Sequence, residues 1–316
     1  MARAPTRPAV AAAVDIGSYS VHLLVAEVTG HQLRVRHDES AFLGLGRRLL
    51  DGGRLGSARA SLRETIEGFA ARATLLGART ITLVGTDPLR RASDAEYAMR
   101  DILDATGISV AVLSHEDEAL LALIGVQQGR PVRRDLVMVD VGGGSTEVLV
   151  VGPGRSSLAV GLPLGAARLT GVHIATDPPI ARELEALRAE VRLVMAGAPE
   201  FDPGELVAVG GTARSLLRIG PPAANRIVSA RRIRKALEVI ATSDAAGVAE
   251  RYGVRLSRAR VLAAGATILA AALDRYGLTR VRVASGGLRE GAILAAHHGG
   301  PGWRERLAEL ARGWVR

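Results

Sequence analysis

The segment Leu136–Val151, LVMVDVGGGSTEVLVV, decides the fold class of this chain. Apolar, largely β-branched residues occupy both ends of the segment, and Gly142, Gly143 and Gly144 lie between them. This pattern predicts two strands joined by a tight turn. A turn without Cβ atoms lets its backbone N–H groups approach an anion, and Asp140 before it suits a divalent cation beside that anion. An ordinary β-hairpin with a glycine turn fits the same segment equally well.

A second copy of this layout favours the anion-binding interpretation. The segment Ala13–Ala26, AVDIGSYSVHLLVA, again has an apolar strand, an aspartate (Asp15), a glycine and a serine, and a second apolar strand. In the later copy Ser145 follows the glycines as a hydroxyl donor, where the earlier copy has Ser18. Two such units predict a duplicated domain in which each half brings one phosphate-binding loop to a shared cleft. Chance repetition of a hairpin pattern is the alternative.

The rest of the chain predicts an α/β fold, because strand patterns alternate with helical patterns throughout. We expect further strands near residues 32–37, 81–84, 109–113, 157–160, 206–209 and 281–283. We expect helices over residues 57–77, 94–105, 119–126, 179–196, 231–241, 245–252, 258–276 and 303–312, with two more beginning at residue 213 and after residue 291.

Local signals add detail to this assignment. Residues 41–56 have the composition of a glycine-rich loop, and Ser57 has the position of a helix cap. Ser114 and Asp117 form a capping-box pattern before a helix that is apolar on nearly all sides. A buried helix places the acids of its first turn at the edge of a core or cleft, where a carboxylate can act as a base.

The bulk composition limits the class of protein. With 316 residues and 48% hydrophobic content, the chain can form two domains of about 150 residues each. No apolar run reaches the roughly 18 residues that span a bilayer, so we expect a cytoplasmic protein that binds no membrane. The absence of cysteine excludes disulfides, thiolate metal sites and cysteine nucleophiles.

The charge of the chain has two interpretations. The net charge is +9, and Lys235 is the only lysine. An arginine-rich chain suits a polyanionic ligand, but a GC-rich genome produces the same composition. With 3% aromatic residues and no nucleic-acid-binding motif, we expect no nucleic-acid partner.

Taken in order, the motifs resemble the exopolyphosphatase and guanosine pentaphosphate phosphohydrolase (Ppx/GppA) family of the actin-like ATPase superfamily. The resemblance covers nearly the whole chain, with VDIGSYS at Val14, GTDPLRRASDA at Gly85, SHEDEA at Ser114, VDVGGGSTE at Val139, PLGAARLT at Pro163, GGTA at Gly210 and GLREG at Gly287. It implies duplicated ribonuclease-H-like domains around a central cleft. It also implies magnesium-dependent removal of terminal phosphate from inorganic polyphosphate or from guanosine pentaphosphate.

The resemblance assigns roles to single residues. Glu118 is similar to the carboxylate that orients and deprotonates the attacking water, and Asp140 to the magnesium ligand, assisted by Glu147 and by Asp15. Arg90 is implied as a charge clamp on phosphate. The implied phosphate donors are Gly17, Ser18, Gly142, Gly143, Gly144 and Ser145. Acidic oxygens without a histidine cluster suit Mg²⁺, or Mn²⁺, better than zinc.

The chain departs from the family pattern at several positions. Tyr19 and Asp94 stand where asparagine is usual, and His115 stands where glycine is common. Phe42 and Leu120 replace basic residues. The acids and both glycine loops are present, so we expect catalysis to be kept. Fewer basic residues weaken the hold on a long polyanion more than on a short one, which favours short-chain polyphosphate.

The motifs end near Gly291, which predicts a short, two-domain form of the family. We expect a first domain over residues 1–124 and a second over residues 125–298, with the terminal helix over residues 299–316 packing back on the first. The resemblance favours a homodimer. Besides a hydrolase of either substrate, a catalytically weak nucleotide- or polyphosphate-binding sensor fits the sequence, and a kinase of the same superfamily fits it less well.

Overall fold

The computed structural model describes residues 8–50, 52–222 and 224–315, and these form two compact units. Unit 1 contains the described residues up to Pro131 and those from Gly286 onward, and unit 2 is Val132–Ser285. The sequence assigned residues 125–131 and 286–298 to the second domain, whereas the structure places them in unit 1. The reason is the packing of α13 (Leu288–Gly299) along α5 (His115–Gln127) within that unit.

Glycines allow this close helix contact. A Cβ added to Gly125 of α5 would lie 2.0 Å from the carbonyl oxygen of Gly287, just before α13. A Cβ added to Gly291 of α13 would lie 1.8 Å from the carbonyl oxygen of Leu121. No side chain larger than a hydrogen fits at either position.

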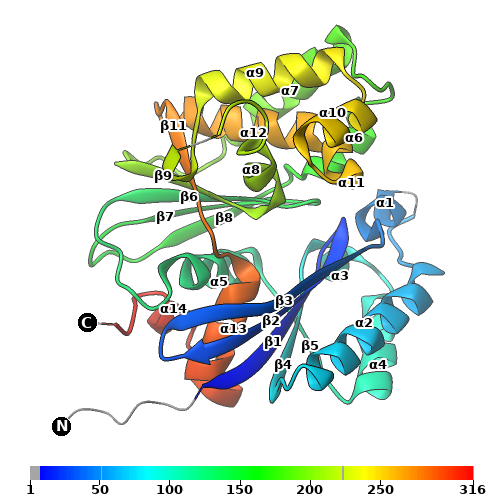
Figure 1. Cartoon of the computed structure of the whole chain (residues 1–316), viewed down its shortest axis with the longest axis vertical. Helices are drawn as coiled ribbons and strands as arrows, with labels where there is room; N and C mark the ends of the chain where they lie inside the picture. Colours follow the sequence, from blue (N-terminus) through cyan, green and yellow to red (C-terminus); the bar gives the residue numbers. More distant parts are fainter. Residues whose placement is uncertain (1–7, 51, 223, 316) are drawn as a thin grey trace. The chain divides into compact units, whose positions relative to one another are not determined.

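Unit 1 is built on a mixed sheet with the strand order β3-β2-β1-β4-β5 (Figure 1). The first three strands are antiparallel neighbours, and β4 and β5 continue the sheet in parallel with β1. The strands are β1 (Ala9–Ile16), β2 (Ser20–Thr29), β3 (Gln32–Phe42), β4 (Thr80–Gly85) and β5 (Val110–Val112). The parallel strands β1, β4 and β5 therefore end at one edge of the sheet, where ligand sites of α/β folds are formed.

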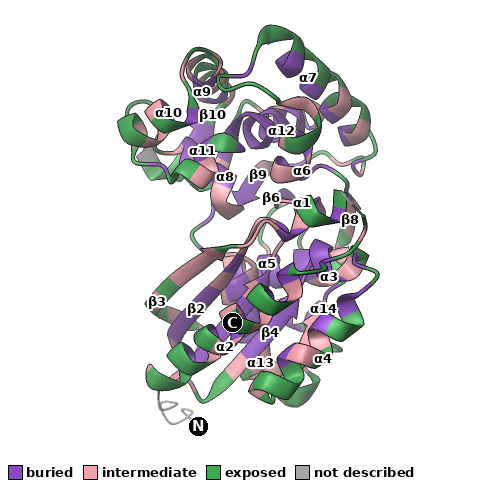
Figure 2. Ribbon diagram, turned by 90° about the vertical axis from the view of Figure 1, so that its right-hand side faces the viewer, coloured by how far each residue is buried: buried purple, intermediate pink, exposed green. Residues whose placement is uncertain are grey.

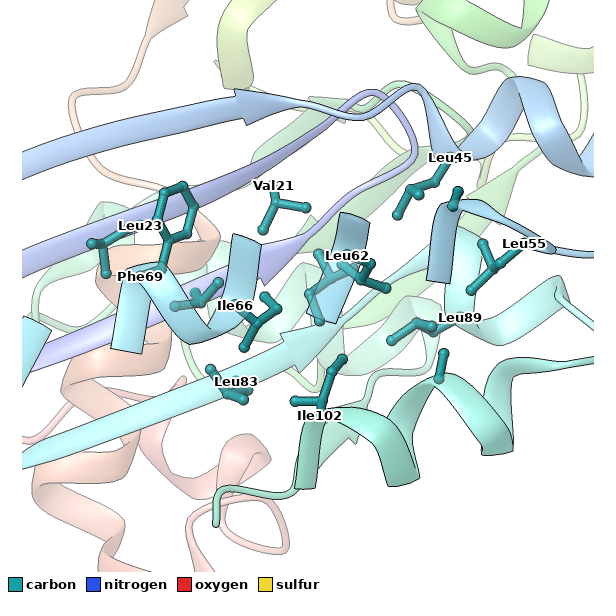
Figure 3. Close-up of a cluster of buried hydrophobic side chains, with 14 of the residues drawn as sticks. Val21, Leu23, Leu45, Leu55, Leu62, Ile66, Phe69, Leu83, Leu89 and Ile102 are labelled. Carbon is teal, nitrogen blue, oxygen red and sulfur yellow. The ribbon is translucent and has the colours of Figure 1, made fainter. Parts of the chain in front are cut away.

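The core of unit 1 lies between the sheet and the helices α2 (Ala58–Leu75) and α4 (Ala95–Thr106) (Figure 3). Leu62, Ile66 and Phe69 of α2 repeat at helical spacing and are buried against the sheet with Leu83 and Ile102. Leu62 has no exposed surface, so its replacement by alanine removes about 2–5 kcal/mol of stability. This burial fixes the sheet edge that carries the polar residues described below.

Unit 2 repeats the topology of unit 1. Its sheet has the order β10-β11-β9-β6-β7-β8, so β8-β7-β6-β9-β11 matches β3-β2-β1-β4-β5 strand for strand and in direction. The strands are β6 (Leu136–Val141), β7 (Thr146–Val151), β8 (Leu158–Leu162), β9 (Glu205–Val209), β10 (Ile227–Ser229) and β11 (Arg280–Val283). The predicted α/β class and the duplication are confirmed.

Helix α12 (Leu262–Arg275) is the buried centre of the helical layer of unit 2, and Figure 2 shows it largely in purple. It contacts α6 (Ala166–His173), α7 (Ala181–Met195), α8 (Gly210–Leu216) and α9 (Ala230–Thr242). The remaining helices of this unit are η1 (Ala224–Arg226), α10 (Ala245–Tyr252) and α11 (Leu256–Arg260). Helix α12 also packs on β6, and its sequence up to Leu273 is accordingly apolar and alanine-rich.

Several predicted elements differ in the structure. The loop expected over residues 41–56 contains a short helix, α1 (Leu45–Leu50), and the helix expected over residues 258–276 is divided into α11 and α12. Ser57 has helical backbone angles and makes no side-chain cap bond among the described residues. The short helix α3 (Asp87–Arg91) was not expected.

The chain end also differs from the expected helix over residues 303–312. The structure has η2 (Gly300–Gly302) and a short α14 (Leu307–Leu310). Arg304 donates to the Asp117 carboxylate at 2.8 Å and to the Val112 carbonyl at 2.7 Å. These bonds tie the segment to the end of β5 and to the start of α5. No helix among the described residues has the length and apolarity needed to cross a bilayer.

Candidate active site

The loop between β1 and β2 in unit 1, residues 17–19, is a tight turn that the next segment holds in place. The Gly17 N–H donates to the Ser20 carbonyl at 3.2 Å and closes the turn. Gly44 and Gly46, before and within α1, donate to the carbonyls of Tyr19 and Ser18 at 3.0 and 2.7 Å. The glycine-rich stretch after β3 therefore supports the loop through its own backbone.

The helix α3 connects this loop to the next strand end. Thr86, before α3, donates its N–H and its hydroxyl to the Ile16 carbonyl at the end of β1. Asp87, the first residue of α3, accepts the Ser18 hydroxyl at 2.6 Å. Arg91 at the end of α3 reaches the same carboxylate at 3.3 Å. One turn of helix thus brings a buried carboxylate to the loop serine.

Glu118 lies in the first turn of α5, where the capping box fixes the start of the helix. Asp117 donates its N–H to the Ser114 hydroxyl at 3.0 Å and accepts the Ser114 N–H at 3.1 Å, as the sequence predicted. Glu118 is 7% exposed. A buried carboxylate at a helix N-terminus is stabilised by the helix dipole and needs a charged partner.

Arg90 is that partner. Its Nη1 donates to Glu118 Oε1 at 2.5 Å and to the Leu113 carbonyl at 2.7 Å. Its Nη2 lies 3.1 Å from His115 Nδ1, and since arginine only donates, His115 Nδ1 is the acceptor. The guanidinium predicted as a phosphate clamp is therefore already bonded to three acceptors, and it fixes Glu118.

The loop between β6 and β7 in unit 2, residues 142–145, repeats the turn of the first loop. The Gly142 N–H donates to the Ser145 carbonyl at 3.0 Å. The first N–H groups of α6 bond to the carbonyls of Gly142 and Gly143, so this helix supports the loop from behind. A Cβ on Gly165 would lie 2.3 Å from the Gly143 oxygen, which explains the glycine in the PLGAARLT motif.

Asp140 and Glu147 form a carboxylate pair beside that loop. They are directly opposite in the antiparallel pair of β6 and β7, and both therefore project from the same face of the sheet. Carboxylate oxygens are the ligands that Mg²⁺ and Mn²⁺ take in proteins. A metal held by this pair stays a prediction.

The corresponding pair in unit 1 has a different composition. Asp15 is directly opposite His22 in the pairing of β1 and β2, so unit 1 has no second carboxylate at this position. The role of Asp15 as an assisting metal ligand stays a prediction.

The structure brings the predicted residues together within each unit. Unit 1 gathers Ser18, Arg90 and Glu118 around α3, and unit 2 gathers Asp140, Ser145 and Glu147 around its glycine loop. Gly17 and Gly142 contribute differently from expectation, because their N–H groups close the turns. Asp87 was not among the residues predicted for the site, although an acid right after a strand end is a recognisable signal.

Comparison with known proteins identifies the family. The family model described as the Ppx/GppA phosphatase family matches residues 24–298. Exopolyphosphatase 1 of Mycobacterium tuberculosis is 30% identical over 302 residues, covering 89% of this chain and 86% of that protein. Exopolyphosphatase 1 of Mycobacterium leprae is 29% identical over 301 residues, covering 89% of this chain and 87% of that protein.

Solved structures support the fold. A crystal structure of the Aquifex aeolicus member of the Ppx/GppA family superimposes with a TM-score of 0.78 at 23% identity, covering 93% of this chain and 99% of that one. An exopolyphosphatase from Cytophaga hutchinsonii gives a TM-score of 0.79 at 20% identity, covering 92% of this chain and 98% of that one. With a family match over most of its length, the chain belongs to the Ppx/GppA phosphatase family, whose members are hydrolases of phosphoric anhydrides.

Proposed function

We propose that this protein is a divalent-cation-dependent exopolyphosphatase that releases terminal orthophosphate from polyphosphate, with short chains preferred. The observation that carries the proposal is Glu118, a buried carboxylate fixed at 2.5 Å by Arg90 at the start of a capped helix. The family and the named relatives agree with this reaction class.

In the proposed reaction, Glu118 acts as the general base. Its carboxylate accepts a proton from a water molecule whose oxygen attacks the terminal phosphorus. A new P–O bond forms, the bridging P–O bond breaks, and its electron pair stays on the shortened polyphosphate. Phosphoryl transfer depends mainly on positioning and on stabilisation of charge, so a carboxylate held by Arg90 suits it.

The glycine loops and the carboxylate pair supply the other parts. Asp140 and Glu147 would hold Mg²⁺ or Mn²⁺, which neutralises phosphate charge when bound. In the turns at residues 17–19 and 142–145, the backbone N–H groups other than those of Gly17 and Gly142 would donate to phosphate oxygens. The chain contains no cysteine, and direct attack by water needs no covalent nucleophile.

One observation favours guanosine pentaphosphate as the second candidate substrate. Tyr19 in the first loop and Phe42 at the end of β3 form an edge-to-face pair with ring centroids 4.8 Å apart. Phe42 is 61% exposed, which is unusual for a large apolar ring in a chain with 3% aromatic residues. An exposed aromatic face can stack on a base, whereas it offers no charge to a polyphosphate chain.

The test is phosphate release by the purified protein from tripolyphosphate, long polyphosphate, guanosine pentaphosphate and ATP, each with Mg²⁺ and with EDTA. We expect phosphate release that requires Mg²⁺ and whose rate per enzyme molecule is highest with one of the two polyphosphates. Release that is fastest from guanosine pentaphosphate would move the assignment to that substrate. Binding of one of the four without any release would replace the enzyme with a sensor.

A further inference from the structure

The hydroxyl of Ser18 has only one hydrogen to donate, and its nearest acceptor is the carboxylate of Asp87. Ser18 Oγ lies 2.6 Å from Asp87 Oδ2, and a carboxylate can only accept, so the serine donates. Ser18 is 5% exposed and Asp87 is 6% exposed, so water competes little for this bond. A hydroxyl that donates to a buried carboxylate has no hydrogen left for a phosphate oxygen.

The second loop repeats this arrangement within unit 2. Ser145 Oγ donates to Glu147 Oε1 at 2.7 Å, and both residues are buried. Each loop serine thus gives its hydrogen to a carboxylate of its own unit. In unit 2 that carboxylate belongs to the proposed metal pair, whereas Asp87 in unit 1 has no role in the proposed reaction.

We infer that Asp87 is a specificity-determining residue that limits the affinity of the first loop for phosphate, an inference that rests on the proposed function. Asp87 accepts the Ser18 hydroxyl hydrogen, and it places next to the loop a negative charge that Arg91, 3.3 Å away, neutralises in part. The loop then binds phosphate through backbone N–H groups alone. Weaker binding of the substrate in its ground state does not lower kcat, because only interactions that are stronger in the transition state than in the ground state raise kcat.

The asparagine variant of Asp87 reverses both effects. The amide of D87N can donate to Ser18 Oγ, which frees the hydroxyl hydrogen for an anion, and the buried negative charge is removed. The S18A variant separates the two effects, because it removes the hydroxyl and leaves the charge at Asp87 in place.

The experiment measures the dissociation constant of tripolyphosphate by titration calorimetry. All four proteins carry E118Q, which stops turnover during the titration. The first has no other change, the second also carries S18A, the third also carries D87N, and the fourth carries both. We expect S18A to change the dissociation constant by less than about 2-fold and D87N to lower it about 10-fold, the scale of one charge-assisted hydrogen bond. In the variant that combines S18A with D87N, the part of the affinity gain that comes from the freed Ser18 hydroxyl should be lost. The matched control is D104N, which removes one exposed carboxylate of α4 and should leave binding unchanged.

The opposite result overturns the inference. If S18A weakens binding about 10-fold while Asp87 is intact, the hydroxyl donates to phosphate and Asp87 does not withhold it. Circular dichroism checks the fold, and should D87N not fold, the S18A comparison decides by itself. Phosphate release by the wild type is measured in parallel: no release contradicts the proposed function, whereas release combined with weakened S18A binding contradicts only this inference.

Discussion

At the scale of single residues, the site of unit 1 depends on how one arginine is bonded. Arg90 connects Glu118, the Leu113 carbonyl and His115, which come from the end of β5 and the first turn of α5. The planar guanidinium can hold three acceptors in fixed directions, which the single ammonium group of lysine cannot. The position of the proposed base therefore depends on Arg90 as well as on the capped helix that carries it.

The R90K variant tests this dependence. We expect kcat for tripolyphosphate to fall about 10- to 100-fold with little change in KM, because a displaced base slows the chemical step. Steady-state kinetics measure both constants, and R100K on the exposed side of α4 serves as the control. A rise in KM at unchanged kcat would show instead that Arg90 binds phosphate.

Asp94 gives a prediction about pH. Burial by itself raises the pKa of this carboxyl, but the backbone N–H groups of Leu55 and Gly56, at 2.8 and 3.0 Å, outweigh it and leave the pKa below its usual value. A carboxyl with a lowered folded-state pKa stabilises the fold above its unfolded pKa of about 3.9, and this stability is lost as the pH falls through the folded value.

The D94N variant should consequently lose stability at neutral pH. We expect a loss of about 1.5 kcal/mol at pH 7, the scale of hydrogen bonds to a charged group, and a smaller difference from wild type at pH 3. Urea unfolding at the two pH values measures it. An equal difference at both values would show that the ionised carboxylate does not matter.

At the scale of elements, the contact between α5 and α13 holds the helix that carries the proposed base in unit 1. Residues far apart in sequence meet there, and Gly125 and Gly291 allow backbone to approach backbone. The same helix α5 carries Glu118 at its other end. A substitution that disturbs this contact should lower the stability of unit 1, and any loss of activity should follow from that loss of stability.

The G125A variant should destabilise unit 1 by at least about 1–3 kcal/mol, because the added methyl meets backbone that cannot move aside. The matched control is G68A in α2, where an added Cβ meets nothing within 4 Å. That variant should be more stable by about 0.5–1 kcal/mol, the helix preference of alanine over glycine. Thermal unfolding measures the stability of both variants. A change in stability of the same sign and size in G125A and G68A would contradict the packing argument.

The order of the elements could be predicted from the sequence because local patterns determine most of them. The capping box at Ser114 and the strands around both glycine loops lie as predicted. What could not be predicted depends on contacts distant in sequence. The membership of α13 in unit 1 depends on its packing against α5, and the break between α11 and α12 has no glycine or proline to mark it.

The site residues were predictable to different degrees for the same reason. Motif positions identified Glu118 and Asp140, and the structure gives each a suitable neighbour within its own unit. The bonds of Arg90 to Glu118 and of Ser18 to Asp87 join residues from separate elements, so no local sequence pattern predicts them.

At the scale of the whole molecule, one domain topology is used twice with different side chains. Unit 1 carries the proposed base, and unit 2 carries the carboxylate pair suited to a metal. The chain as a whole has a net charge of +9, almost all from arginine. A positive field of this size attracts polyanions, and salt screens it.

The KM for polyphosphate should consequently rise with ionic strength. Between 50 and 500 mM NaCl we expect a several-fold rise for long polyphosphate and a smaller one for tripolyphosphate, with kcat changed less than about 2-fold. Initial-rate measurements over this range check it. An equal rise for both substrates would show that the charge of the chain as a whole does not attract the substrate.

The proposed role of Glu118 as the general base of a phosphoric anhydride hydrolase can be tested against a neighbouring acid of the same helix. Phosphate release from tripolyphosphate is compared for the wild type, E118Q and E116Q, since Glu116 is an exposed acid two residues earlier in the same helix. We expect E118Q to lose activity by about 100- to 10,000-fold and E116Q to stay close to wild type. Activity of E118Q within a few-fold of wild type, or an equal loss in both variants, would contradict it.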